Sequence, residues 1–221
     1  MITPSTLHFL TALQKNNDRS WFEKHKEEYL AAKEEVTIFA EAVNTGLNQT
    51  DVIGKCHIYR IYRDVRFSKD KTPYKDHLGA YYYRQGAERR GGYIFRVGPG
   101  VSQVGGGFFG PEKDDLLRIR QELAFDSQPI EEITRHAEFV RQFGELRGEG
   151  VKTAPRGFDK EHPNIKWLRK KQFYALRTFS DEEVVRPEFV EQTVDCFRAL
   201  RPFFDYMSEV LTTSADGEVM I

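Results

Sequence analysis

The strongest constraint on the fold is a change of residue pattern in the middle of the chain. Four runs rich in β-branched and aromatic residues follow one another, separated by Gly or Pro turns, at 57–67, 78–84, 93–97 and 101–109. Runs of this kind predict the consecutive strands of an antiparallel meander. Such a sheet must bury one face against the segments that flank it.

Helical periodicity frames these strands on both sides. Apolar residues recur at helical spacing over 7–13, 21–43, 116–123, 130–140 and 187–211, and a further helix is predicted over 163–176. The pattern predicts an α+β fold, with a central antiparallel sheet of about four or more strands flanked by N-terminal, middle and C-terminal helices. Without an internal repeat or a linker, we expect a single domain over residues 1–221.

Composition excludes several classes of protein. The 33 Lys and Arg residues nearly cancel 34 Asp and Glu residues, so no whole-molecule field favours nucleic acid or an acidic membrane. Cys56 and Cys196 lack metal-ligand spacing and predict reduced thiols, with no cofactor. Neither a secretory signal nor a membrane span is present in the sequence, which predicts a cytoplasmic protein without a membrane partner and leaves its oligomeric state open.

The positive charge is concentrated in one part of the chain. Residues 55–90 contain ten Lys or Arg against four Asp or Glu, an excess of six. Within them, the segment 60–75 begins as a predicted strand and ends as a polar turn. At a period of two, Arg63 shares a face with four apolar or aromatic residues: Tyr59, Ile61, Val65 and Phe67. A guanidinium placed there needs a carboxylate, carbonyl groups or an anionic ligand as acceptor.

The segment therefore predicts a site for a small ligand that carries a phosphate or a carboxylate. Its cations would supply charge and bidentate donors, a tyrosine would supply a hydroxyl group, and Pro73 would stiffen the turn. The candidate ligand-binding residues are Arg60, Tyr62, Arg63, Arg66, Lys69, Lys71, Tyr74 and Lys75.

The sequence leaves open whether any reaction takes place there. In an enzyme, Asp64 or Asp70 would be the catalytic residue acting as general base, and the arginines would stabilise developing negative charge. This combination favours hydrolytic or transfer chemistry on a phosphoryl or acyl group over redox chemistry.

Two alternatives come from other functional classes. In a structural or protein-interaction module, the basic segment would form an internal ion-pair network, with Arg63 paired to a helix acid such as Glu23 and Asp64 bridging Arg66 or Arg60. In a nucleic-acid-binding protein, a basic and aromatic surface would contact the backbone and stack bases. Its residues would be Lys166, Arg169, Lys170, Lys171 and Arg177 with Trp167, Phe173 and Tyr174. An amphipathic helix with inward aromatics explains the same pattern more simply.

Two further motifs favour structural interpretations. Gly105-Gly106-Gly107 is not followed by Gly-Lys-Ser/Thr, and acidic residues occupy the next helical turn, so a tight strand-to-helix turn is favoured over a phosphate loop. Four possible metal ligands near the basic segment match no standard spacing, and no metal site is predicted: Asp64, Asp70, Asp76 and His77.

The basic segment also supports a family resemblance. The string RIYRDVRFSKDKTPYK, with NNDRSWF upstream and GGYIF and GGGFFGP downstream, resembles a widespread bacterial family catalogued as a conserved domain of unknown function. The order and spacing of these strings extend over most of the chain. The resemblance supports the predicted fold and implies no activity, substrate or cofactor.

Overall fold

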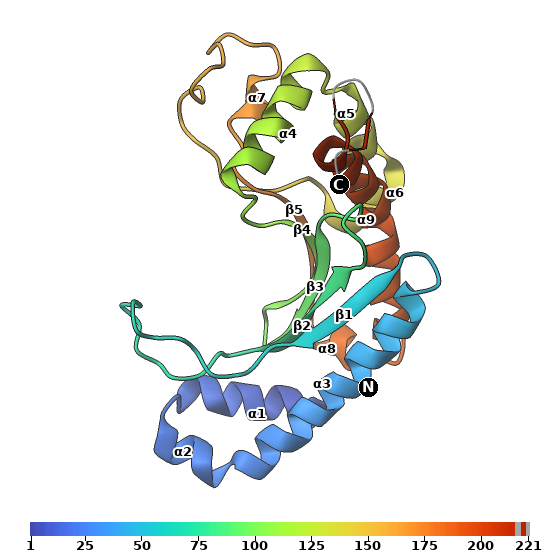
Figure 1. Ribbon diagram of the computed structural model, residues 1–221. Helices are drawn as coiled ribbons and strands as arrows, with labels where there is room; N and C mark the ends of the chain where they lie inside the picture. The colour runs from blue at the N-terminus through green and yellow to red at the C-terminus, as the bar shows by residue number, and fades with distance from the viewer. Residues whose placement is uncertain (215–217, 220–221) are drawn as a thin grey trace. The chain divides into compact units, whose positions relative to one another are not determined.

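The computed structural model describes residues 1–214 and 218–219. Within them, the chain forms a five-stranded antiparallel sheet with helices at the N-terminus, in the middle and at the C-terminal end, which confirms the predicted α+β class (Figure 1). The strands lie in the order β1-β2-β3-β4-β5, so each one pairs with its neighbour along the chain. No helix in the described part of the chain has the length and apolar composition needed to cross a bilayer.

The strands are β1 (Ile53–Ile58), β2 (Leu78–Arg84), β3 (Gly92–Val97), β4 (Ser102–Phe108) and β5 (Phe173–Phe179). The N-terminal helices are α1 (Pro4–Lys15), α2 (Arg19–Lys24) and α3 (Lys26–Leu47). The later helices are α4 (Lys113–Phe125), α5 (Gln128–Arg135), α6 (Ala137–Phe143), α7 (Ile165–Leu168), α8 (Asp181–Val184) and α9 (Phe189–Thr212).

The chain is divided into two compact units. Unit 1 contains residues 1–83, 94–104 and 178–195, and unit 2 contains 84–93, 105–177 and the chain from 196 onward. The single domain predicted for residues 1–221 stays a prediction.

Unit 1 is built on the contact between α3 and one face of the sheet. The ring of Phe39 on α3 lies edge-on to Phe95 at 5.0 Å and stacks on Phe189 at 4.8 Å. The hydroxyl group of Tyr82 donates a hydrogen bond of 3.0 Å to the carbonyl oxygen of Ala40. All five of these residues are buried, so aromatic packing holds this helix to the strands.

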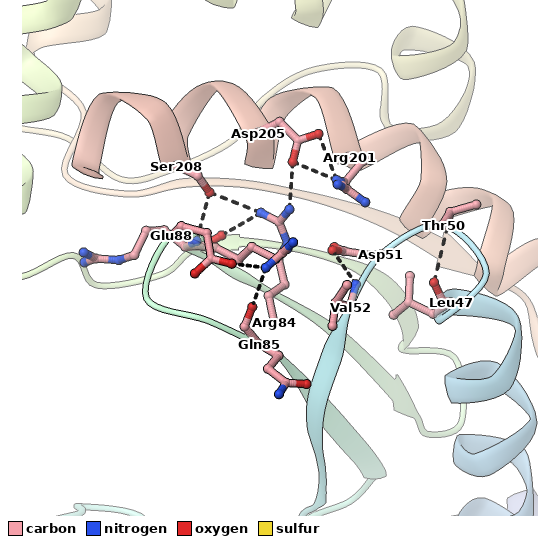
Figure 2. A network of polar contacts seen from close by, with 12 residues as sticks. Leu47, Thr50, Asp51, Val52, Arg84, Gln85, Glu88, Arg201, Asp205 and Ser208 are labelled. Atoms are coloured by element: carbon pink, nitrogen blue, oxygen red, sulfur yellow. Dashed lines mark hydrogen bonds and ion pairs between the residues drawn. The ribbon is translucent and has the colours of Figure 1, made fainter. Parts of the chain in front are cut away.

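Unit 2 contains a buried arginine at the end of β2. The Arg84 side chain is only 1% exposed and donates 2.7 Å to Asp205 of α9 and 3.2 Å to Ser208 (Figure 2). It also lies over the ring of Phe204, 5.5 Å from its centre, while Arg201 shares the Asp205 carboxylate. A charge this deeply buried needs such partners, because the guanidinium cannot give up its proton.

We expect Asp205→Ala to lower the free energy of unfolding by about 2 kcal/mol, because a hydrogen bond to a buried charge is lost. Chemical denaturation followed by circular dichroism measures this change. The matched control is Glu88→Ala, which removes an exposed carboxylate paired with Arg89 and should cost less than about 0.5 kcal/mol. Equal losses in the two variants would contradict the importance of this contact.

The first strand ends earlier than predicted, which corrects one feature of the basic segment. β1 ends at Ile58, although the Tyr59 amide still donates to Gly79 of β2 at 2.9 Å. Beyond that point the chain leaves its partner strand, and Phe67 is 96% exposed. The strand predicted over 57–67 is therefore wrong beyond residue 59, and Arg63 does not lie on an apolar strand face, because no strand of the sheet pairs with the later residues.

The helix predicted over 163–176 is confirmed only for four residues and is wrong for the rest. This region forms the short helix α7 followed by β5, in which Phe173, Ala175 and Phe179 are buried on alternate positions. Trp167 and Phe173 are buried, so these rings point inward as the simpler interpretation expected, and they are not available on a surface that would stack bases.

Glycines in β4 explain why β5 fits beside it. Gly105 to Gly107 lie inside β4 and not in the predicted strand-to-helix turn. A Cβ atom at Gly105 would clash with the Ala175 carbonyl group, and one at Gly107, where φ is +148°, would clash with Phe173. The glycines thus permit the close approach of the last strand.

Candidate functional site

The basic segment lies in the long connection between β1 and β2. Its two limbs pair with each other: Tyr62 and Tyr74 form an antiparallel bridge, the Arg63 amide donates to the Pro73 carbonyl at 2.9 Å, and the Lys75 amide donates to Ile61 at 2.8 Å. The connection is therefore a closed, hairpin-like loop whose outer part contains residues 64–72, and it extends alongside α1 (Figure 1).

Residues from α2 and from the connection between α1 and α2 hold the base of this loop. The Asn17 side chain accepts from the Tyr74 amide at 3.1 Å and donates to the Tyr74 carbonyl at 3.0 Å. The Tyr74 ring stacks on Phe22 of α2 with centroids 4.0 Å apart and planes 15° apart. Tyr74 and Ile61 are buried, so the base of the loop is fixed although its outer part is exposed.

Asn17→Ala should lower the free energy of unfolding by about 1–3 kcal/mol, because two hydrogen bonds to a buried backbone position are lost together. Thermal unfolding measures the change, and limited proteolysis should show faster cleavage within 60–75. Asn16→Ala is the control, since that exposed side chain bonds only to Ala12 within its own helix. An unchanged cleavage rate in Asn17→Ala would contradict the anchoring role.

Arg63 has partners inside the same loop. Its Nη1 atom donates to Asp70 at 2.5 Å, to the Thr72 carbonyl at 3.3 Å and to the Thr72 hydroxyl group. Its Nε and Nη2 atoms have no hydrogen-bond partner among the described residues. The acid beside Arg63 thus comes from the turn that follows it and not from a helix residue such as Glu23.

The other charges of the loop are arranged separately. Arg66 binds Asp64 through two nitrogens at 3.0 and 2.6 Å. Lys71 donates to the Val65 carbonyl at 2.9 Å. In the described part of the chain, the side chains of Arg60 and Lys69 form no hydrogen bond or ion pair. The cations therefore do not all converge on one point.

A cavity of about 510 Å³ lies between the end of α1 and this loop. Its wall is formed by Gln14, Asn17, Arg63, Asp70, Thr72, Tyr74, Lys75, Asp76 and His77. Four of the ten predicted site residues line it: Arg63, Asp70, Tyr74 and Lys75. The remaining six lie outside the wall: Arg60, Tyr62, Asp64, Arg66, Lys69 and Lys71.

Sequence reasoning missed the part of the wall that α1 and its C-terminal end contribute. Gln14 and Asn17 lie more than forty residues before the basic segment and reach it only in the folded chain. Asn17 directly follows the C-cap residue of α1. Its place in the string NNDRSWF, one of the strings that support the family resemblance, is the signal that could have pointed to it.

Local hydrogen bonds keep the carboxylates of the loop ionised. The Thr72 amide, followed by Arg63 and the Thr72 hydroxyl group, lowers the pKa of Asp70 to about 2. The Arg66 guanidinium lowers the pKa of Asp64. Burial favours the neutral form of Asp76, but His77 and Arg96 outweigh it and lower the pKa of this carboxyl group as well. Burial lowers the pKa of Lys75.

We expect the Asp70 carboxyl group to titrate near pH 2 in an NMR-monitored titration. Because this pKa lies below the value of about 3.9 in an unfolded chain, the carboxylate stabilises the fold above about pH 4, and the stabilisation is lost as the pH falls through 2. Arg63→Gln should raise the titration midpoint. Arg66→Gln, the matched control, should leave it unchanged, and equal shifts in both variants would contradict the assigned contacts.

Two other cavities lie in unit 2. One of about 270 Å³ is lined in part by Lys166, Trp167 and Lys170, but Lys166 pairs with Glu131 at 3.0 Å and Lys170 donates to the Leu146 carbonyl. Another of about 530 Å³ lies beside α4 and the end of α9. The cation on its wall, Arg118, donates to the Val210 carbonyl group.

The thiols and possible metal ligands form no further centre in the part of the chain that is described. Cys56 is a half-buried free thiol whose pKa is raised by burial, and the buried Cys196 donates to Gln142 at 3.3 Å. Among residues 1–214 and 218–219, no group of three or more His, Cys, Asp or Glu side chains could hold a metal ion.

Comparison with known families places most of the chain in one of them. A family model described as a conserved hypothetical protein (DUF2461) matches residues 5–206. The match includes the helices that hold the loop, the loop itself and the whole sheet. No curated protein and no solved structure matches the chain.

Proposed function

The chain belongs to the conserved hypothetical protein family DUF2461, and we propose that it binds a small phosphate- or carboxylate-bearing ligand in the cavity beside the β1–β2 connection. One observation supports this proposal above the others. Arg63 lies on the wall of a cavity of about 510 Å³, its side chain is 27% exposed, and Asp70 and Thr72 engage only its Nη1 atom. The Nε and Nη2 donors form the fork that binds an oxyanion bidentately.

Several other wall residues suit the same class of ligand, although the carboxylates of Asp70 and Asp76 also line the cavity. Lys75 donates one hydrogen bond to the Arg60 carbonyl at 2.9 Å, and an ammonium group has three donors. His77, Gln14 and Thr72 add polar groups around the opening. A cavity of this size is in the range that small ligands occupy in proteins.

We assign the carboxylates of the loop a positioning role within this proposal. A general base works best when its pKa lies near the working pH. Asp70, with a pKa of about 2, and Asp64, with a lowered pKa, are weak proton acceptors at neutral pH. Their hydrogen bonds instead hold Arg63 and Arg66 in place. The hypothesis also includes a hydrolytic or transfer reaction at this site and a cytoplasmic location for the protein.

A structural module is the second candidate. The pairs Arg63–Asp70 and Arg66–Asp64 are both internal to the loop, as an ion-pair network would require. Under this alternative the loop needs no ligand, and its charges serve only to fix its course.

We expect a phosphate- or carboxylate-bearing compound to raise the unfolding temperature of the wild type. At about 100 times its dissociation constant, a ligand stabilises by about 2.7 kcal/mol, which corresponds to roughly 5–10 °C in a chain of this length. A thermal-shift panel of inorganic phosphate, nucleotides, sugar phosphates and dicarboxylates measures this. Arg63→Lys, which keeps the charge but loses the fork, should abolish most of the shift.

Arg66→Lys is the matched control, because it makes the same change on an arginine outside the cavity. It should keep the full ligand-induced shift. If no compound stabilises the wild type, or if both variants respond like the wild type, the loop has the structural role and the binding proposal fails.

A further inference from the structure

The face of the unit 1 sheet opposite to α3 carries aromatic side chains. In β2, Tyr82 points toward α3, so Tyr81 and Tyr83 point to the other side, because side chains alternate along a strand. On β1 and just beyond it, His57 and Tyr59 occupy positions of the same parity, one residue after the inward-facing Cys56.

These rings form two contacting pairs. Tyr81 and Tyr83 lie 4.6 Å apart between ring centres, and His57 and Tyr59 lie 5.5 Å apart. Tyr83 is 47% exposed, and His57 is exposed as well. Burial, followed by the neighbouring hydroxyl groups of Tyr59 and Tyr83, raises the pKa of Tyr81 to about 12. The Tyr81 hydroxyl group therefore stays protonated at neutral pH and can donate a hydrogen bond.

Cations lie beside the rings. The Lys75 ammonium group is 5.1 Å from the centre of the Tyr59 ring. Arg96 lies on β3, next to β2, at a position that alternates with the inward-facing Phe95. Its buried Nε atom has no hydrogen-bond partner among the described residues. The Arg96 guanidinium is close enough to Asp76 to lower the pKa of that carboxyl group, and it adds positive charge beside the rings.

The chain segment around these rings also carries a net positive charge. Residues 55–75 contain seven Lys or Arg against two Asp, an excess of five positive charges. An anionic partner is favoured by this balance, and the exposed Tyr83 ring beside the half-buried Tyr81 favours one that also presents flat rings. An acidic peptide would satisfy the cations but would leave the row of rings without a matching surface.

We propose that this face binds single-stranded nucleic acid, with bases stacked on Tyr81 and Tyr83 and backbone phosphates bound near Lys75 and Arg96. Exposed aromatic residues on a sheet, flanked by cations, stack successive unpaired bases irrespective of sequence. A duplex does not offer its base faces in this way. The inference shares Lys75 with the small-ligand cavity, but Tyr81, Tyr83 and Arg96 do not line that cavity, so the two proposals can fail separately.

Fluorescence anisotropy with labelled oligouridylate and oligodeoxythymidylate tests the proposal on the full chain. Binding should weaken as salt rises from about 50 to 200 mM, with a slope of roughly 0.7 per phosphate contact. Tyr81→Leu and Tyr83→Leu should each weaken binding about 5- to 150-fold. Arg96→Gln should reduce the salt slope by about one contact.

Two matched controls test whether binding depends on this face or on any exposed ring or cation. Phe125→Leu removes another exposed aromatic ring, and Lys33→Gln removes another exposed cation; both should bind like the wild type. Circular dichroism checks that each variant is folded. Ultraviolet crosslinking of the wild type should attach the oligonucleotide to the peptide that contains residues 78–84.

Three results would each overturn the proposal. They are the absence of saturable binding to both oligonucleotides, equal affinity for a duplex of the same length, and unchanged affinity in the folded Tyr81→Leu and Tyr83→Leu variants. The outcome for the small ligand is separate, because Arg63→Lys alters the cavity and leaves the tyrosines in place.

Discussion

The stacking of Tyr74 on Phe22, together with the two hydrogen bonds between Asn17 and the Tyr74 backbone, is the contact on which the candidate site depends. A connection of nineteen residues between β1 and β2 has no strand neighbour of its own, and loops of that length are rarely ordered without such support. The helices supply it by burying one tyrosine at the base. Once Tyr74 is fixed, the bridge to Tyr62 brings the two limbs together, and the cavity forms against α1.

Short-range pairing then determines what the charges of the loop can do. Arg63 meets Asp70 seven residues later, and Arg66 meets Asp64 two residues earlier, so each carboxylate is ionised and each arginine is oriented. This arrangement lowers the basicity of the acids and leaves donors of Arg63 available. The loop is consequently better suited to bind an anion than to remove a proton. Only a ligand that engages the remaining donors would distinguish this function from a purely structural network.

The sheet gives unit 1 two faces of different chemistry. One face carries Tyr82 and Phe95, which are buried against α3, while the other carries exposed or half-buried tyrosines and Arg96. This division follows from the period of two along each strand. Tyrosine suits the second face because its ring packs on neighbours and its hydroxyl group stays in contact with water. The same backbone therefore builds both the core and the proposed binding surface.

The amino-acid sequence by itself determined the α+β class, most helices and the middle strands, because apolar periodicity and turn residues are local properties. It also indicated family membership and the concentration of charge in residues 60–75. It did not predict β5, since basic residues between aromatic ones resemble a helix, and the strand exists only because Gly105 and Gly107 let it approach β4. Nor did it predict that Arg63 would leave the sheet, or that Gln14 and Asn17 would line the cavity. Those features were decided by the tertiary structure, because they arise from contacts between residues far apart in the chain. Local sequence patterns do not predict such contacts.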